Sequence, residues 1–159
     1  MEETEMKKHN DLIQKSEYLL SQDSMKEYTD EEILKLDSMV DELIAKYGWE
    51  EVYKTWIDYL HTECKTDQEV VNFARNFFDY ASDRYIPDPI HFVAYLYYRV
   101  DTQTNPLAFD IFDSLAITIL PNAGLINNNE IDSYSAEADP RIQVEIEKIK
   151  KKEKSYFTL

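Results

Sequence analysis

Five helix-start signals between residues 29 and 140 constrain the fold of this chain more than any other feature. Thr29 and Thr66 are each followed three residues later by a glutamate, Glu32 and Glu69, which is the spacing of a capping box. In a capping box, the hydroxyl and the carboxylate satisfy backbone N–H groups that the first helical turn leaves free. The other signals pair an N-capping residue with proline at the first helical position, and they are Asp88-Pro89, Asn105-Pro106 and Asp139-Pro140. The sequence therefore predicts an all-α fold.

Apolar residues recur at helical spacing after each signal, and they predict about six to seven helices. The expected helices lie at about 3–21, 30–47, 49–64, 67–81, 89–100, 106–120 and 140–154. Gly48 is expected to be a left-handed C-cap, and Pro121 is expected to end the sixth helix. The chain has only two glycines, and tight antiparallel turns often need glycine, so a large β-sheet is not expected.

The length of 159 residues fits a single compact helical domain. We expect residues 29–120 to form the helical core. An N-terminal helix and linker at 1–28 precede it, and a polar loop at 121–139 and a basic C-terminal helix and tail at 140–159 follow it. The first and last helices are candidate appendages that either dock on the core or reach a partner.

The absence of disulfide, signal and membrane patterns indicates a protein that is cytoplasmic or is delivered into a cytoplasm. Cys64 is the sole cysteine, so no intramolecular disulfide is possible, which suits a reducing compartment. Residues 1–10 are charged and lack the apolar run of a signal peptide. Charged or amide residues interrupt every apolar stretch well before the roughly 20 residues that a membrane span needs.

Negative charge is concentrated in the first 139 residues. The net charge is −15, and it divides into −9 over residues 1–66, −9 over 67–139 and +3 over 140–159. Such a body repels nucleic acid and anionic membranes and attracts a basic protein. The candidate partner-binding carboxylates lie on two consecutive expected helices, and they are Asp30, Glu31, Asp37, Asp41, Glu42, Glu50, Glu51 and Asp58. Their charge serves solubility or imitates the phosphate backbone of nucleic acid.

Tyrosines form the second candidate binding surface. The chain has twelve tyrosines, and a cluster of them surrounds the segment Ile86-Pro87-Asp88-Pro89. Tyr95, Tyr97 and Tyr98 cannot all face one side of a helix, so at least one is expected at the surface, where tyrosine favours binding. The candidates from this cluster are Tyr85, Tyr95 and Tyr98.

Residues that could carry catalysis or bind a metal occur only as pairs. His61 and Cys64 are three residues apart on one expected helix, but a zinc site needs three or four ligands. Asp110 and Asp113 have the same spacing and could serve a small carboxylate-dependent hydrolase, or they could simply be solvated charges. No phosphate-binding loop, dinucleotide fingerprint, zinc-protease motif or nucleophile elbow is present. We therefore expect neither a catalytic site nor a cofactor or metal.

The stretch from Gly48-Trp49 to Pro121 resembles small helical domains of unknown function from Gram-positive gut bacteria and their phages. The motifs that carry the resemblance are Gly48-Trp49 with Trp56, Cys64-Lys65-Thr66, Ile86-Pro87-Asp88-Pro89, Tyr97-Tyr98-Arg99-Val100-Asp101 and Asp113-Ser114-Leu115-Ala116. In size and charge alone, the chain is also similar to phage-encoded inhibitors of CRISPR effectors, known as anti-CRISPR proteins.

These features together predict a non-enzymatic acidic binding protein. Its concrete form would be a phage-type inhibitor that engages a basic nucleic-acid-processing protein, such as a CRISPR effector, as a DNA mimic. The first alternative is a structural or regulatory helical module that binds through its aromatic surface, and the second is the carboxylate-dependent hydrolase.

Overall fold

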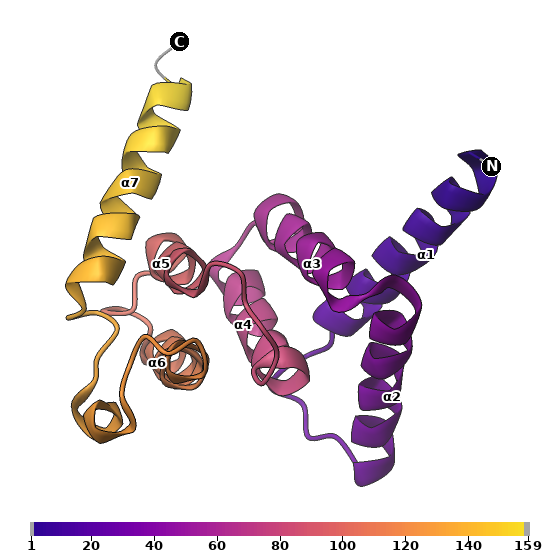
Figure 1. Ribbon diagram of the computed structural model, residues 1–159, viewed down its shortest axis with the longest axis horizontal. Helices are drawn as coiled ribbons and strands as arrows, with labels where there is room; N and C mark the ends of the chain where they lie inside the picture. The colour runs from indigo at the N-terminus through magenta and orange to yellow at the C-terminus, as the bar shows by residue number, and fades with distance from the viewer. Residues whose placement is uncertain (1, 158–159) are drawn as a thin grey trace. The chain divides into compact units, whose positions relative to one another are not determined.

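Seven α-helices and one 3-10 helix make up the secondary structure of the described part of the chain, which contains no strand (Figure 1). This computed structural model describes the backbone of residues 2–157 and the side chains of residues 10–152. The α-helices are α1 (Glu2–Leu20), α2 (Asp30–Tyr47), α3 (Trp49–Glu63), α4 (Asp67–Ala81), α5 (Pro89–Arg99), α6 (Pro106–Asn122) and α7 (Pro140–Phe157), and the 3-10 helix η1 is Asn128–Ser133. The prediction of an all-α fold is confirmed.

The helix-start signals form the predicted caps. The Glu32 N–H donates to the Thr29 hydroxyl over 3.2 Å, and the Thr29 N–H donates to the Glu32 carboxylate over 3.3 Å. The same pair of bonds joins Thr66 and Glu69, each at 3.2 Å. Three further side chains accept an N–H from the first turn of the following helix, and they are Asp88 before α5, Asn105 before α6 and Asp139 before α7.

Gly48 is the C-cap of α2, as predicted, and its N–H donates to the Ile44 carbonyl over 2.8 Å. Its predicted left-handed helical conformation and the predicted end of α6 at Pro121 were wrong. Gly48 has the positive φ that a glycine allows, 85°, but its ψ of 148° lies outside the left-handed helical region. This extended conformation starts α3 one residue after α2 ends. Pro121 does not end α6, which continues to Asn122. Proline is compatible with a helical φ, and in the last turn its missing N–H removes only one hydrogen bond.

The chain divides into two compact units, residues 1–80 and residues 81–159. The predicted core at 29–120 spans this division, so its boundaries do not coincide with those of the units. In the first unit, α1 packs on α2 and α3, and in the second unit, α7 packs on α5. The first and last helices are therefore docked parts of their own units.

The core of the first unit contains three fully buried aromatic side chains, Trp56, Phe73 and Phe77. Trp56 is fully buried, as the sequence predicted, and its indole N–H donates to the buried Ser16 hydroxyl over 3.0 Å. The indole meets the rings of Trp49 and Phe77 edge-on, at centroid distances of 5.8 and 6.1 Å. These contacts tie α1, α3 and α4 together around one side chain.

The polar loop of the second unit is held in place by hydrogen bonds. Glu137 accepts hydrogen bonds from the Thr102 hydroxyl and the Gln103 amide, and the Tyr134 hydroxyl donates to Asp139 over 2.8 Å. The Arg141 guanidinium binds the Asp139 carboxylate and the carbonyl of Leu125. The loop is therefore anchored at its end to the residues that precede α6 and start α7. Within the described residues, no helix has the length and apolar character to cross a membrane.

Candidate binding surface and pocket

All eight predicted carboxylates lie on α2 and α3, and all are exposed to solvent. We call this set the acidic face, and its members are Asp30, Glu31, Asp37, Asp41 and Glu42 of α2 with Glu50, Glu51 and Asp58 of α3. On α2 the set follows from helical geometry, because Leu36, Val40 and Leu43 occupy the side that packs inward. At 100° per residue, Asp30, Asp37 and Asp41 then fall on one stripe of the solvent side.

Most of this charge is not neutralised within the molecule. Together, α2 and α3 carry ten carboxylates and three lysines. Setting Asp41 aside, no carboxylate of the acidic face has a basic nitrogen within 4.0 Å among the residues that the structure describes. The face therefore projects a net negative field that a basic surface could complement.

Exposed apolar side chains interrupt the acidic face. Leu34 is 66% exposed and Ile33 is 44% exposed, although both belong to a helix whose inward side is already apolar. Leu34 follows Asp30 by four residues and precedes Asp37 by three, so it lies on the acidic stripe itself. A large apolar group surrounded by charged ones is the arrangement of an interface centre with a polar rim.

A pocket of about 390 Å³ borders the acidic face within the first unit. It lies between the segment that follows α1 and the helices α2 and α4, and we call it the α2–α4 pocket. Its lining residues are Ser24, Lys26, Tyr28, Ile33, Leu36, Asp37, Arg75, Asn76, Asp79 and Tyr80. The volume is within the range of small-ligand sites, about 300–1,000 Å³. Asp37 and Ile33 line the pocket and are also exposed on the solvent side of α2. The α2–α4 pocket and the acidic face are therefore continuous.

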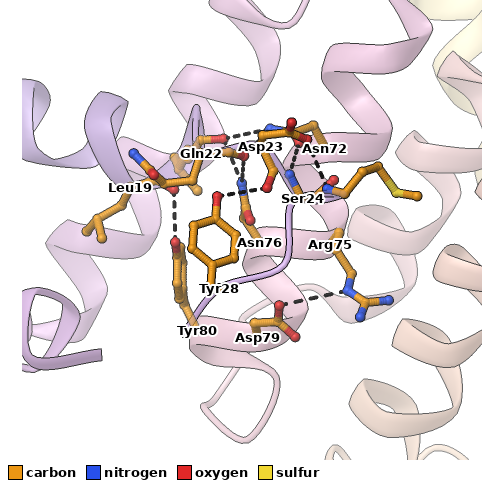
Figure 2. A network of polar contacts seen from close by, with 12 residues as sticks. Leu19, Gln22, Asp23, Ser24, Tyr28, Asn72, Arg75, Asn76, Asp79 and Tyr80 are labelled. Atoms are coloured by element: carbon orange, nitrogen blue, oxygen red, sulfur yellow. Dashed lines mark hydrogen bonds and ion pairs between the residues drawn. The ribbon is translucent and has the colours of Figure 1, made fainter. Parts of the chain in front are cut away.

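Hydrogen bonds from α4 to the end of α1 build one wall of the pocket (Figure 2). The Asn76 amide donates to the carbonyls of Leu20 and Gln22 over 3.0 and 2.8 Å, and Asn72 binds the same two oxygens. The Tyr80 hydroxyl donates to the carbonyl of Leu19 over 3.1 Å. The carbonyls of Leu19 and Leu20 have no partner within α1, because a helix leaves its last four carbonyls free, and Gln22 lies just beyond the end of α1. The α4 side chains therefore cap α1 and fix the position of the pocket wall.

Two carboxylates of the pocket are disfavoured in their charged form. Partial burial raises the pKa of Asp37, and the nearby charge of Asp41 adds to this effect. Partial burial also raises the pKa of Asp79, against the opposing influence of Arg75, and the charge of Asp37 raises it further. The Arg75 Nε lies 3.8 Å from Asp79, which is a loose ion pair. Both carboxylates thus retain capacity for a further cation.

Lys26 and Tyr28 line the pocket from the segment that follows α1. The Lys26 ammonium lies 5.0 Å from the centroid of the Tyr28 ring and 3.3 Å from the Glu32 carboxylate. The Tyr28 hydroxyl donates to the carbonyl of Asp23 over 2.8 Å, which fixes the ring (Figure 2). The Lys26 ammonium therefore already lies over the Tyr28 ring, in the geometry of a cation–π contact.

The structure separates the three predicted surface tyrosines. Tyr85 is 74% exposed and Tyr98 is partly exposed, but Tyr95 is 7% exposed. The Tyr95 hydroxyl accepts a hydrogen bond from Arg99 over 2.8 Å. Tyr95 is therefore part of the core of the second unit, because the inward side of α5 passes through it, and it is removed from the candidate surface.

The paired residues considered for catalysis and metal binding are not brought together with others of their kind. No group of three or more histidine, cysteine, aspartate or glutamate residues suited to a metal ion occurs among the described residues. His61 is exposed and Cys64 is buried. Asp110 is exposed, whereas Asp113 is partly buried, and its Oδ1 is buried without a hydrogen-bond partner among the described residues.

Sequence reasoning missed the half of the pocket that α4 contributes. A signal for it was present, because Asn72, Asn76 and Tyr80 recur every four residues on one side of a helix whose other buried positions are apolar. Buried amides need partners, and here the partners are the carbonyls at the end of α1. Arg75 and Asp79 flank this stripe, so their placement at the pocket follows from it.

Comparison with models of protein families, with curated proteins and with solved structures finds no match to this chain. The resemblances to phage-associated helical domains and to anti-CRISPR proteins therefore stay predictions. The acidic face and the α2–α4 pocket are the features from which function is inferred.

Proposed function

We propose that this protein is a non-enzymatic binding protein whose acidic face engages a basic partner. The observation that carries the proposal is a set of eight exposed carboxylates on α2 and α3, largely without internal ion pairs, with Leu34 exposed on the α2 stripe that holds Asp30 and Asp37. Leu34 has 66% of its surface exposed between Asp30 and Asp37 of the α2 stripe, so it is available to an apolar group of a partner. Charge complementarity would speed the encounter, and Leu34 would supply an apolar anchor after docking.

A partner that handles nucleic acid fits the charge of the face, and this is the inhibitor function proposed from the sequence. The α2 helix has 18 residues, so it is about 27 Å long at 1.5 Å per residue. Its six carboxylates and two lysines give one net negative charge per about 7 Å, against one per about 3.4 Å along a DNA strand. Because α2 alone has about half the charge density of a strand, competition with nucleic acid would require the α3 carboxylates as well.

The test measures association with a partner isolated from the source cell by pull-down. The variant Asp37→Lys, Asp41→Lys, Glu42→Lys reverses three charges on α2. A control variant, Asp83→Lys, Asp110→Lys, Asp132→Lys, makes the same change of net charge at exposed positions of the second unit. Electrostatic steering changes association rates by about 10- to 1,000-fold. We expect the α2 variant to associate at least about tenfold more slowly than wild type and the control to lose less than about threefold.

Salt and competition measurements complete the test. The association rate of wild type should fall steeply as salt rises, because the Debye length shrinks from about 10 Å at 0.1 M to about 3 Å at 1 M. If the partner binds nucleic acid, the protein should displace it, and the α2 variant should not. If the α2 variant and the control variant associated at equal rates, or if the association rate of wild type did not change with salt, the acidic face would not be the binding surface. Tyr85, which is exposed, and Tyr98, which is partly exposed, would then be the better candidates.

A further inference from the structure

The α2–α4 pocket combines three kinds of groups that recognise a planar organic cation. Asp37 and Asp79 supply carboxylates from two helices, Tyr28 and Tyr80 supply aromatic rings, and Ile33 and Leu36 supply an apolar surface. Carboxylates bind a guanidinium through paired hydrogen bonds, and aromatic faces attract it through their electron density. A metal ion is a poor match, because the described residues contain no cluster of three potential ligands.

The lining of the pocket carries two carboxylates, Asp37 and Asp79, and two cations, Lys26 and Arg75, but these cations engage the two carboxylates only weakly. Arg75 approaches Asp79 only to 3.8 Å, and Lys26 pairs with Glu32 outside the pocket lining. The Ser24 hydroxyl oxygen is buried and has no hydrogen-bond partner among the described residues. A further cation between Asp37 and Asp79 would relieve the repulsion between these two carboxylates.

We infer that the α2–α4 pocket binds the guanidinium group of an arginine side chain that the partner inserts at the edge of the acidic face. The inference rests on the proposed function, because it names the chemistry by which the basic partner is recognised. Arginine suits the pocket better than lysine, since a guanidinium is planar, weakly hydrated and able to stack on a ring while it pairs with a carboxylate. The volume of about 390 Å³ leaves room for the whole side chain.

The test needs no partner, because N-acetyl-arginine amide serves as the probe. Its binding is followed by chemical-shift changes in amide NMR spectra of the full chain. N-acetyl-citrulline amide has nearly the same shape without the charge, and N-acetyl-lysine amide has the charge without the plane. We expect saturable shifts at residues that line the pocket, with the arginine probe binding more tightly than the lysine probe and the citrulline probe binding least.

Matched variants separate the pocket from general surface charge. Asp37→Asn and Asp79→Asn should each weaken binding of the arginine probe by about fivefold, the upper range for a partly exposed ion pair. Asp30→Asn removes an equal charge from the same face outside the pocket, and it should weaken binding by less than about twofold. Arg75→Gln should strengthen binding, because it removes the competing guanidinium, and it should do so more than the control Lys35→Gln on the outer side of α2.

Three outcomes would overturn the inference. If the citrulline probe bound as tightly as the arginine probe, the pocket would not recognise the charge. If the lysine probe bound as tightly as the arginine probe, the pocket would not recognise the planar guanidinium. Equal effects of Asp30→Asn and Asp79→Asn would place the probe on the acidic face at large. Because the titration involves no partner, any of these results would leave the proposed function to its own test of association rates. Slow-associating α2 variants would still support the proposed function after this inference had failed.

Discussion

The hydrogen bond between Trp56 and Ser16 should be the most sensitive polar contact in the first unit. Both groups are buried, with 0% and 1% of their surface exposed, and the bond of 3.0 Å joins α3 to α1. Ser16→Ala leaves the indole N–H buried without an acceptor, which should cost about 1–3 kcal/mol of unfolding free energy. Trp56→Phe keeps an aromatic ring against Phe77 but orphans the Ser16 hydroxyl and leaves a void, and it should cost about 2–3 kcal/mol.

The double variant Ser16→Ala, Trp56→Phe isolates the bond itself. Replacing both partners with apolar groups removes the unsatisfied group that each single change creates, so the double variant should be little less stable than Trp56→Phe alone. The expected coupling energy is about 1 kcal/mol. Trp56→Ala, which also removes the ring contacts with Trp49 and Phe77, should cost about 3–5 kcal/mol.

Urea unfolding followed by tryptophan fluorescence measures these changes in the right part of the chain. Both tryptophans of the chain, Trp49 and Trp56, lie in the first unit, so the signal reports on that unit and Trp49 remains as a probe in the variants. Ser38→Ala, on the exposed side of α2, is the control and should change stability by less than about 0.5 kcal/mol. If the single costs of Ser16→Ala and Trp56→Phe added within about 0.3 kcal/mol, the buried hydrogen bond would be refuted. A cost below about 1 kcal/mol for Trp56→Ala would refute the placement of the α3 face.

Three further changes test the caps and the titrating groups. Asn76→Ala should lower the unfolding free energy of the first unit, measured in urea, by about 1–2 kcal/mol, because carbonyls at the end of α1 lose a buried donor. An unchanged unfolding free energy would mean that these carbonyls do not depend on α4. Burial raises the pKa of Asp113 above 3.8, so its charge costs stability at neutral pH and this cost disappears as pH falls through the raised pKa. Asp113→Asn should therefore stabilise the second unit at pH 7, with a gain that fades toward pH 3 in circular-dichroism melts; a constant gain would refute the titration. Asp139 behaves oppositely, because hydrogen bonds from Arg141 and Tyr134 outweigh burial and hold its pKa below 3.8. The stability that the ionised Asp139 contributes is present above the unfolded-state pKa and is lost as pH falls through the lower folded-state pKa. Asp139→Asn should therefore destabilise the protein at pH 7 and be as stable as wild type at pH 2. An equal loss of stability at both pH values would indicate that the substitution acts through packing.

The helices were predictable because their start signals act over three or four residues. Thr29 reaches Glu32 and Asn105 reaches Ala108 within one helical turn, so the chain nearby contains all the information needed. The same locality explains the exposure of the α2 carboxylates, since the apolar stripe at Leu36, Val40 and Leu43 already determines which side packs inward.

The pocket and the division into units were not predictable in this way, because they depend on contacts between distant residues. Asn76 meets Gln22 across 54 positions, and nothing near Gln22 in the sequence indicates that its carbonyl needs a donor from α4. Tyr95 shows the same limit at the level of one residue. Tyr95, Tyr97 and Tyr98 have identical side chains on one helix, and only the packing of α5 against α6 and α7 decides which of them is buried.

The capping of α1 by α4 has a consequence for synthesis on the ribosome. The partner of the Leu19 carbonyl, Tyr80, lies 61 residues further along the chain. At roughly 5–20 residues per second, the ribosome adds that stretch in about 3–12 s. Throughout that interval the nascent α1 lacks the α4 donors that cap its C-terminal end, and Leu12, Leu19 and Leu20 lack the complete unit in which they are buried. A translational pause between codons 22 and 80 would therefore lengthen the time for which these leucines are open to chaperones and proteases.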